Sequence, residues 1–388
     1  MNILVAQSGG PTPVINASLY GVVVQALSEK KITKVLASVN GMEGLLHNRI
    51  IELTDKVALI KRAKEQPGAI IGSSRYALTE FDYERIVDQL IELSIEIFCY
   101  IGGNGSAVSL HQIHEVCKAR KLDIKCIFIP KTIDNDVCGT DHTPGYLSAV
   151  HFLTKTIRYL EADMRSISSQ PQIEIMEVMG GNVGWLMAAS TCRKSARNDF
   201  PQLAYLPEQE VSISELLGDI ERSLKGSSNI LLMVSDHMKI NELNSDITIH
   251  NPRKNYNGGI SYRLAQEIQI QMNIKTRITI PNSLYRSSME FVSKQDVLEA
   301  EATGREAIKA GLRGETGKMI GIERTENYPY MYQFVCVDLS EISGKERSLP
   351  ANFWDGKQHK ATQSFHDYLL PLINLEALPN VVTLENLL

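Results

Sequence analysis

The sequence predicts an α/β protein whose mainly parallel sheets are sandwiched by helices. Short apolar runs alternate with amphipathic stretches in the first half of the chain, which is the pattern of parallel strands with crossover helices. Two of the apolar runs are followed by a glycine turn and then by a helical pattern. The length of 388 residues is enough for two domains, each with its own core.

The first set of elements begins close to the N-terminus. Strands are predicted at Ile3–Ala6, Lys34–Val39, Ile95–Ile101 and Ile124–Ile129, and helices at Asn16–Leu27 and Ala107–Arg120. Gly9-Gly10 lies between the first strand and the first helix, and the run from Gly102 to Ser106 lies between the third strand and the second helix. Each glycine turn is therefore predicted at the carboxyl end of a parallel strand, where ligands of α/β proteins bind.

The second set of elements has the same character. Helices are predicted at Ala149–Ala162, Gly184–Cys192, Ile213–Ser223 and Gly259–Met272, and strands at Ile173–Met179, Asn229–Ser235 and Arg277–Ile280. The polar stretch from Asn244 to Asn257 is predicted to be a loop. Without a solenoid repeat or a low-complexity linker, the economical architecture is two Rossmann-like lobes with the active site in the cleft between them.

Composition and charge exclude several classes of protein. The net charge of -5, with no dense basic run, argues against nucleic-acid binding. No apolar run approaches the roughly 20 residues that span a bilayer. The six cysteines form neither zinc-type pairs nor the framework of a secreted domain. We expect a cytoplasmic protein with no nucleic-acid or membrane partner.

The run from Pro130 to Asp136, Pro-Lys-Thr-Ile-Asp-Asn-Asp, is the most informative in the chain. Asp134 and Asp136 follow an apolar segment that reads as a buried parallel strand. At such a strand end, one carboxylate can accept the proton of an attacking hydroxyl while the other holds Mg²⁺ against phosphate groups. A solvated Asx-type turn explains the same residues, so the run alone leaves both interpretations open.

The glycine turns add a second indication of phosphate chemistry. Backbone N–H groups at a helix N-terminus form an anion site, and glycine allows a phosphate to approach closely. Neither turn has the Walker or the dinucleotide spacing, and a single turn could be structural only. Gly72-Ser73-Ser74-Arg75 adds a guanidinium that could clamp phosphate oxygens, although an ordinary surface arginine is the simpler local reading. Two turns and an acidic loop, all at strand ends, favour a phosphate cradle.

Together these residues resemble the phosphofructokinases of the glycolytic, non-ribokinase type. The resemblance covers nearly the whole chain, and its long form is similar to the branch that contains the pyrophosphate-dependent enzymes. The motifs that carry it are Gly9-Gly10, Gly72–Arg75, Gly102–Ser106, Lys131–Asp136, Thr140–Tyr146, Glu177–Gly180, Gly258-Gly259, Arg286–Ser288 and Phe365–Ile373. It implies a donor lobe of residues 1–146 and 285–326 and a sugar-phosphate lobe of residues 147–284 and 327–388.

The resemblance also implies a role for each site residue. Asp134 would be the general base towards the 1-hydroxyl of fructose 6-phosphate, with Lys131 and Thr132 beside it. Asp136 and Asn104 would hold Mg²⁺. The donor, ATP or pyrophosphate, would bind Gly10, Arg75, Gly103, Asn104, Gly105 and Ser106. The acceptor would bind Thr132, Asp134, Met179, Gly180, Gly181, Asp236, Arg286 and Arg277, the last from a neighbouring subunit of a homodimer or homotetramer.

The acceptor residues depart from the family at several positions. Gly181 stands where the family usually has arginine, and Asp236 where it usually has glutamate. Gln172 aligns with an inter-subunit arginine of ATP-dependent bacterial relatives, while Ser283 and Tyr285 replace an aromatic or histidine and a glutamine. Each missing charge-assisted hydrogen bond could cost about 1.5–3 kcal/mol, or roughly one to two decades of affinity. Weak fructose 6-phosphate binding, a different sugar phosphate or a regulatory subunit would follow.

Two positions bear on the phosphoryl donor. Pyrophosphate users of the family typically have aspartate where Gly105 stands, and a glycine leaves space for a nucleotide. Lys131 instead resembles the pyrophosphate users and some long ATP-dependent relatives. The balance favours ATP, with a pyrophosphate enzyme, a kinase for a related sugar phosphate and a noncatalytic paralogue as alternatives. A dehydrogenase is discounted because Val35–Asn40 does not end in the acidic residue that would bind a ribose.

Overall fold

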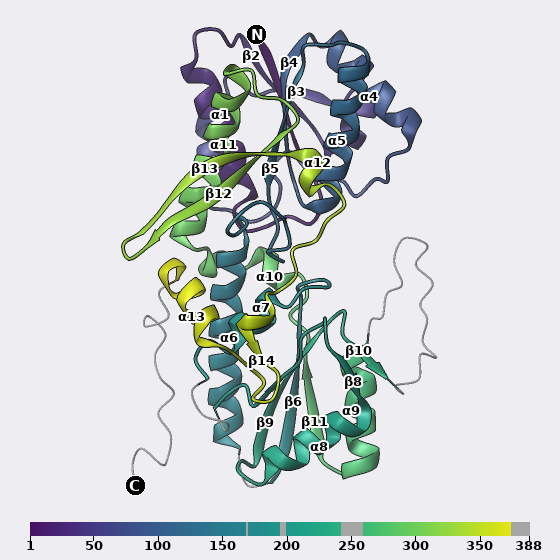
Figure 1. The fold of residues 1–388 in the computed structure, drawn as a ribbon, viewed down its shortest axis with the longest axis vertical. Helices are drawn as coiled ribbons and strands as arrows, with labels where there is room; N and C mark the ends of the chain where they lie inside the picture. The colour runs from purple at the N-terminus through teal and green to yellow at the C-terminus, as the bar shows by residue number, and fades with distance from the viewer. Residues whose placement is uncertain (168–169, 195–198, 242–258, 374–388) are drawn as a thin grey trace. The chain divides into compact units, whose positions relative to one another are not determined.

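The computed structural model describes residues 1–167, 170–194, 199–241 and 259–373. Its contacts divide the chain into two compact units, one of Met1–Ala149 with Arg286–Arg347 and the other of Val150–Tyr285 with the chain from Ser348 onward. Each unit is an α/β structure built on a mainly parallel sheet, as predicted (Figure 1). The predicted loop at 244–257 lies outside the described residues.

The first unit contains a seven-stranded sheet in the order β13-β12-β5-β4-β1-β2-β3. Its strands are β1 Asn2–Gln7, β2 Lys34–Ser38, β3 Ile50–Glu52, β4 Ile95–Gly102, β5 Lys125–Pro130, β12 Lys318–Asn327 and β13 Tyr330–Asp338. All neighbours pair in parallel except β3 with β2 and β13 with β12. The carboxyl ends of β1, β4 and β5, where the site motifs follow, therefore lie along one edge of the sheet.

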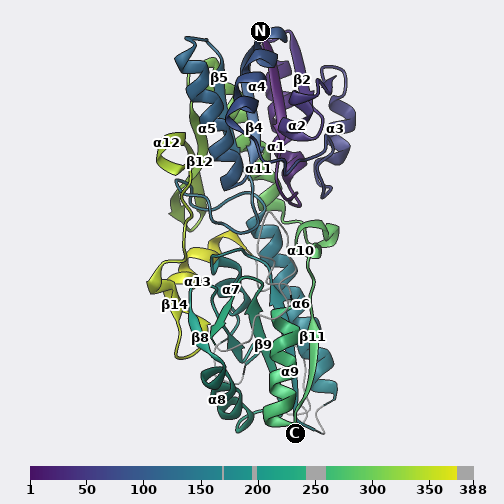
Figure 2. The same ribbon diagram turned by 90° about the vertical axis from the view of Figure 1, so that its right-hand side faces the viewer.

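Helices cover both faces of this sheet (Figures 1 and 2). The helices of the unit are α1 Ile15–Ser28, α2 Gly41–Leu46, α3 Val57–Ala63, α4 Glu80–Glu92, α5 Asn104–Ala119, α11 Lys294–Leu312 and α12 Leu339–Ile342. Strand residues of opposite parity feed two separate cores, because side chains alternate across a sheet. One core packs Val5 and Ile129 against α1, α3 and α11, and the other packs Leu4 and Phe128 against α2, α4, α5 and α12.

The second unit has a four-stranded parallel sheet in the order β11-β6-β9-β7. Its strands are β6 Gln172–Val178, β7 Leu203–Ala204, β9 Asn229–Ser235 and β11 Lys275–Thr279, with the small pairs β8 Glu210–Ser212 with β10 Lys239–Asn241 and β14 Trp354–Asp355 with β15 Lys360–Ala361. The helices are α6 Tyr146–Ser166, α7 Trp185–Ser190, α8 Ile213–Leu224, α9 Ile260–Met272 and α13 Gln363–Leu369. Apolar residues of β6 and β9 pack against α8 and α9.

The remaining short elements are α10 Leu284–Ser287 and the 3-10 turns Met289–Phe291, Ala351–Phe353 and Leu370–Leu372. None of the helices that the structure describes is long and apolar enough to cross a membrane.

The predicted domain boundary at residue 326 differs from the structure. Strand β13 pairs with β12 along nine positions from Lys318↔Asp338 to Asn327↔Tyr330, so the chain stays with the first sheet until Arg347. Asn327 and Pro329 indicate a turn here, but no local pattern assigns the strand that follows to the first sheet. The helix predicted from Ala107 begins earlier, at Asn104, which places Asn104 and Gly105 in its first turn.

Candidate active site

The acidic loop follows β5 directly and is tied to its neighbours by backbone hydrogen bonds. Lys131 N donates to Gly102 O at 2.8 Å, and Thr132 pairs with Gly145 in an isolated bridge. Within the loop, Asp134 N donates to the Thr132 hydroxyl at 3.1 Å, and Asn135 adopts a positive φ of 59°. The loop is therefore a defined turn that ends a buried strand, with Asp134 and Asp136 on either side of Asn135.

Lys131 connects this loop to the first glycine turn. Its side chain is 2 % exposed, and its Nζ donates to Gly10 O at 2.7 Å. Burial lowers the pKa of Lys131 to about 8, Arg286 and Arg75 push the pKa in the same direction, and Asp134 and Asp136 oppose them. The ammonium is thus held beside two guanidinium groups, an arrangement that favours an anionic ligand.

Gly10 is covered by both arginines. A Cβ added at Gly10 would lie 2.5 Å from Arg286 Nη1 and 3.3 Å from Arg75 Nη2. The segment that carries Arg75 is fixed to the turn, because Ser73 Oγ donates to Gly9 O at 2.6 Å and Gly9 N donates to Ser74 O at 3.2 Å. Three cations therefore meet the Gly9-Gly10 backbone, which is the chemistry of a phosphate site.

Asp136 is held by the second glycine turn. Asn104, the first residue of α5, donates through Nδ2 to Asp136 Oδ2 at 2.8 Å and to Asp136 O at 3.0 Å. The other carboxylate oxygen, Oδ1, is buried and has no hydrogen-bond partner among the residues that the structure describes. Burial, followed by the charge of Asp134, raises the pKa of Asp136 to about 7. A buried oxygen of this kind fits a divalent cation.

The described residues contain no group of three or more His, Cys, Asp or Glu side chains that could hold a metal ion by themselves. Mg²⁺ usually takes one or two carboxylates and completes its shell with water and substrate phosphates. The pair Asp136 and Asn104 therefore fits a cation that arrives with a phosphorylated ligand.

The remaining predicted donor residues line the start of α5. A Cβ built on Gly105 would meet no atom within 4 Å, so this position opens into free space. A Cβ on Gly103 would lie 3.6 Å from Lys131 O, and Ser106 Oγ donates to Ser8 Oγ at 3.0 Å. The second glycine turn is thus fastened to the first through the two serines, and Gly105 is left uncovered.

The predicted acceptor residues other than Thr132, Asp134 and Arg286 belong to the second unit. Gly180 and Gly181 have φ values of 156° and 63°, which form the turn after β6 that starts at Met179. Asp236 follows β9, and its backbone N donates to Val178 O at 3.0 Å. The ends of β6 and β9 therefore bring Met179 and Asp236 together, as the parallel pairing of these strands requires.

Two further positions of the acceptor set have structural partners. Arg277 Nη2 lies 2.7 Å from Asp163 Oδ2, and its Nε lies 2.9 Å from Glu174 Oε2. Gln172 is buried and donates to Met164 O, Ile167 O and Asn229 Oδ1. Within one chain, Arg277 is neutralised by two carboxylates, and Gln172 serves the packing of the second unit.

Arg286, which was predicted to bind the sugar phosphate, lies in the first unit with the predicted donor residues. Its guanidinium shares the Gly10 turn with Arg75. The structure therefore brings Gly10, Arg75, Asn104, Lys131, Asp136 and Arg286 into one cationic and acidic cluster.

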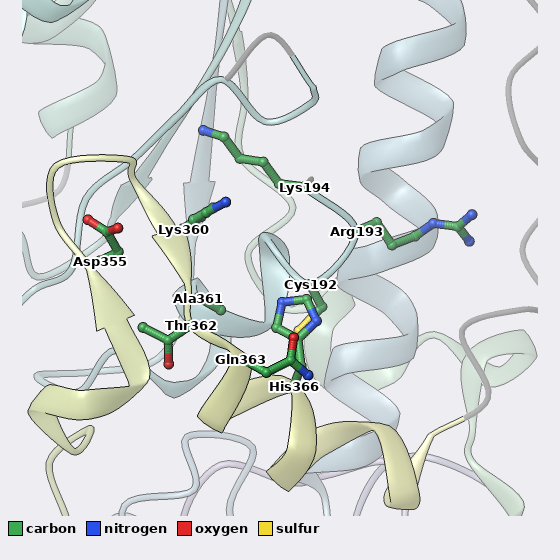
Figure 3. Close-up of a pocket in the computed structure, with 9 residues that line it drawn as sticks. All are labelled: Cys192, Arg193, Lys194, Asp355, Lys360, Ala361, Thr362, Gln363 and His366. Atoms are coloured by element: carbon green, nitrogen blue, oxygen red, sulfur yellow. The ribbon is translucent and has the colours of Figure 1, made fainter. Parts of the chain in front are cut away.

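A separate cavity of about 500 Å³ lies in the second unit (Figure 3). It is lined by Cys192, Arg193, Lys194, Asp355, Lys360, Ala361, Thr362, Gln363 and His366. None of the predicted site residues lines it. Lys194 is buried and donates to Gln202 O and His359 O, so it fastens backbone segments together.

Comparison with known proteins identifies the family of the chain. The family model described as Phosphofructokinase matches residues 2–310. The chain is 33% identical to the sulfofructose kinase of Alkalicoccus urumqiensis over 97% of this chain and 96% of that protein. It is 30% identical to the pyrophosphate--fructose 6-phosphate 1-phosphotransferase of Xanthomonas campestris over 99% of this chain and 96% of that protein.

The fold is also similar to a solved structure. The pyrophosphate-dependent phosphofructokinase of Marinobacter aquaeolei superposes with a TM-score of 0.86 at 27% identity, covering 99% of this chain and 96% of that one. The fold and these matches assign the chain to a class of phosphotransferases. The chain belongs to the phosphofructokinase family.

The sequence did not indicate that His142 and Glu299 connect the segment after the acidic loop to α11. His142 contacts Asp141 and also Glu299, which is 157 residues further along the chain. The Thr140–Tyr146 motif was a signal for this region, but no spacing in the sequence connects it to α11.

Proposed function

We propose that the chain transfers a phosphoryl group from ATP to the 1-hydroxyl of fructose 6-phosphate in a Mg²⁺-dependent reaction, giving fructose 1,6-bisphosphate. The observation that carries the proposal is the cluster at Gly10, where Lys131, Arg75 and Arg286 meet beside the Asp134 and Asp136 loop. Phosphoryl transfer needs little covalent chemistry from the protein, and it depends on positioning and on charge stabilisation. This cluster offers both.

Asp134 is the proposed general base. Its place is set by the hydrogen bond from its backbone N to the Thr132 hydroxyl, within a loop that begins at buried Lys131. A carboxylate that accepts a proton late in a loose transition state needs little pKa adjustment. Lys131 supplies a positive charge next to it and holds the Gly10 carbonyl.

Asp136 and Asn104 are the proposed Mg²⁺ residues. Asn104 secures one oxygen of the carboxylate and leaves the buried Oδ1 for the cation. The bound metal ion would neutralise charge on the phosphate groups of the donor. Gly10, Gly103, Gly105, Ser106 and Arg75 would hold those phosphates at the two glycine turns.

The acceptor is proposed to bind Thr132, Met179, Gly180, Gly181, Asp236 and Arg286, with Arg277 serving a neighbouring subunit of a homodimer or homotetramer. Support for fructose 6-phosphate as the acceptor comes from the Xanthomonas relative, a pyrophosphate--fructose 6-phosphate 1-phosphotransferase. The similarity to this relative covers nearly the full length of both chains. The pairing of Arg277 with Asp163 and Glu174 means that a sugar phosphate would compete with these carboxylates for the guanidinium.

The choice of ATP over pyrophosphate depends on Gly105. The open space around its Cα would accommodate a nucleotide, whereas an aspartate would place a carboxylate there. Pyrophosphate is the second candidate donor, and it is favoured by the names of the Xanthomonas and Marinobacter proteins and by Lys131 at the Gly10 turn. A pyrophosphate enzyme would run readily in both directions.

A fructose with a sulfonate in place of its 6-phosphate is the second candidate acceptor. Gly181 removes one cation that the family usually offers, and Gln172 is a buried structural residue. A phosphate monoester carries about −1.5 to −2 charges at pH 7, whereas a sulfonate carries a single negative charge and needs fewer cationic contacts. The similarity of the chain to the sulfofructose kinase of Alkalicoccus urumqiensis supports this candidate.

The test is an activity screen of the purified full chain with Mg²⁺. It crosses ATP, ADP and pyrophosphate with fructose 6-phosphate, sulfofructose, sedoheptulose 7-phosphate and fructose, and product is detected by mass spectrometry. We expect the highest kcat/KM with ATP and fructose 6-phosphate. Preference for pyrophosphate or for sulfofructose would select the second donor or the second acceptor.

The control for the screen is Asp134→Asn, which should lower any turnover that belongs to this protein by at least about 10²-fold. Binding of a sugar phosphate without turnover in any combination would contradict the enzyme proposal and indicate a noncatalytic regulatory protein.

A further inference from the structure

His142 lies between two carboxylates in the interior of the first unit. Its Nδ1 is 2.8 Å from Asp141 Oδ2, and its Nε2 is 2.6 Å from Glu299 Oε2. The side chains of His142 and Glu299 are both 0% exposed. Asp141 precedes His142 in the segment after the acidic loop, and Glu299 belongs to α11. The imidazole therefore joins the segment after the acidic loop to α11, which packs against one face of the seven-stranded sheet.

Both ring nitrogens face oxygens that can only accept hydrogen bonds when the carboxylates are ionised. A neutral imidazole has one N–H and would leave its second nitrogen lone pair against a carboxylate lone pair. With both nitrogens protonated, each contact becomes a charge-assisted hydrogen bond. We propose that His142 is an imidazolium at neutral pH that clamps the Asp134–Asp136 loop to α11 and so positions the two carboxylates, an inference that rests on the proposed function for its catalytic part.

The groups that face His142 balance its charge. Arg324 Nη2 lies 2.8 Å from Asp141 Oδ2, so two cations meet two carboxylates once the ring is protonated. Tyr330 OH and Gln295 Nε2 donate to the other oxygen of Glu299, at 2.7 and 2.9 Å, and Arg347 donates to the backbone oxygens of Thr140 and Asp141. With a neutral ring, the buried Glu299 carboxylate would face an uncharged group at Nε2, which is costly for a carboxylate removed from water.

The carboxylates themselves favour the ionised form. Burial alone would raise the pKa of Asp141 and of Glu299, but His142 and the other donors outweigh burial and lower both. Arg324 on Asp141, and Tyr330 and Gln295 on Glu299, stabilise the ionised carboxylates independently of the ring, which disfavours a protonated carboxyl group that donates to a neutral imidazole.

Hydrogen bonds from backbone N–H groups connect His142 and its neighbours to the acidic loop and to α11. Thr143, the next residue, donates from its backbone N to Asn135 Oδ1 at 3.0 Å, and Asn135 lies between Asp134 and Asp136. Gly145 N donates to Asp296 Oδ1 at 2.8 Å, and Ser148 N donates to Asp296 Oδ2 at 2.9 Å, so α11 holds this segment at a second point. Arg347 N donates to Asp136 O at 2.8 Å. A shift of His142 would move Asn135 and its two acidic neighbours.

Protonation on both nitrogens can be observed directly. In the full chain labelled with ¹⁵N-histidine, we expect two slowly exchanging ring N–H signals from His142 at neutral pH, assigned by their loss in His142→Gln. One ring N–H signal would overturn the imidazolium. In Glu299→Gln, the amide can donate to the ring, so we expect one signal.

The positioning role has a kinetic readout. His142→Gln and Glu299→Gln should each lower kcat about 10-fold or more with less than a 2-fold change in the KM of the donor, because misplacement of a reacting group by about 1 Å can cost about 10²-fold. His366→Gln, in the second unit, is the matched control and should leave kcat unchanged. Unchanged kcat in folded His142→Gln would overturn the positioning role.

The pH dependence of stability separates the clamp from the proposed reaction. Because the extra proton is stabilised only in the folded chain, its contribution is present at acid and neutral pH and is lost as the pH rises until the ring releases it. We expect the Tm of the wild type to fall on this alkaline side while that of His142→Gln changes less. If the wild type transferred no phosphoryl group, two ring N–H signals and this Tm profile would still support the clamp, whereas equal profiles would overturn it.

Discussion

The acidic loop of the first unit and the glycine turn of the second unit are built in opposite ways. The acidic loop and the segment that follows it to Tyr146 are mostly buried and are cross-linked. Lys131 bonds to Gly10 and His142 contacts Glu299, both far away in the chain, while Asn135 accepts a hydrogen bond from Thr143 within the same stretch. The turn at Gly180-Gly181 has no side chain and depends on backbone conformation. The residues proposed for phosphoryl transfer are thus held by side-chain contacts, while the Gly180-Gly181 turn offers no cationic side chain to the proposed acceptor.

The largest expected effect is at the acidic loop. Asp134→Asn should leave the fold intact and lower kcat by at least the ~10²-fold that is typical of lost acid–base catalysis. Steady-state kinetics with matched Tm values measures this. Asp123→Asn, at a carboxylate whose side chain is 92% exposed, is the matched control. Turnover near the wild-type value in Asp134→Asn would remove the proposed general base.

A smaller effect is expected at the Gly10 turn. Gly10→Ala adds a Cβ 2.5 Å from Arg286 Nη1, so the guanidinium must move. Because one displaced charge-assisted hydrogen bond is worth about 1.5–3 kcal/mol, the KM of the donor should rise about 10-fold or more. Gly218→Ala within α8 is the control, since its Cβ would lie 3.4 Å from Arg222 Nη1. An unchanged donor KM would argue that the arginines do not hold the donor.

The charge of Lys131 should give the donor affinity a pH dependence. Burial lowers the pKa of Lys131 to about 8, so the free enzyme loses this positive charge as the pH rises through that value. We expect kcat/KM for the donor to fall several-fold between pH 7 and about pH 9. Lys131→Arg, which stays charged, should flatten the profile. A wild-type profile that is flat over this range would contradict the role of the lysine charge.

The smallest effect is expected at Gly181. An arginine there would restore a cation, but the φ of 63° is a left-handed conformation that costs a side-chain-bearing residue about 1–2 kcal/mol. We expect Gly181→Arg to lower Tm by a few degrees and to lower the KM for fructose 6-phosphate modestly. Gly181→Gln bears the same backbone cost without a guanidinium and is the matched control. A KM for fructose 6-phosphate that rises in Gly181→Arg alone would indicate an acceptor of lower charge.

The difference between the two regions also explains which elements and site residues could be predicted from the sequence. The strands ending at Gln7, Gly102 and Pro130 were predictable because buried parallel strands are continuous apolar runs, and the motifs follow them immediately. The hairpin return of β13 was not, because its residues alternate between half-buried and exposed positions and carry no turn signal that assigns them to a particular sheet. The positions at which the acceptor residues differ from the family could be seen in the sequence. The left-handed backbone conformation of Gly181 could be seen only in the structure.

By itself, the sequence determined the α/β class, the two glycine turns and the acidic loop between Lys131 and Asp136, because apolar periodicity and local turn chemistry operate over a few residues. Only the tertiary structure decided that Arg286 shares the Gly10 turn with Arg75, that Arg277 is neutralised by Asp163 and Glu174, and that Glu299 holds His142. These contacts join residues that are far apart in the chain. They arise from the way the strands and helices pack, which no local pattern encodes.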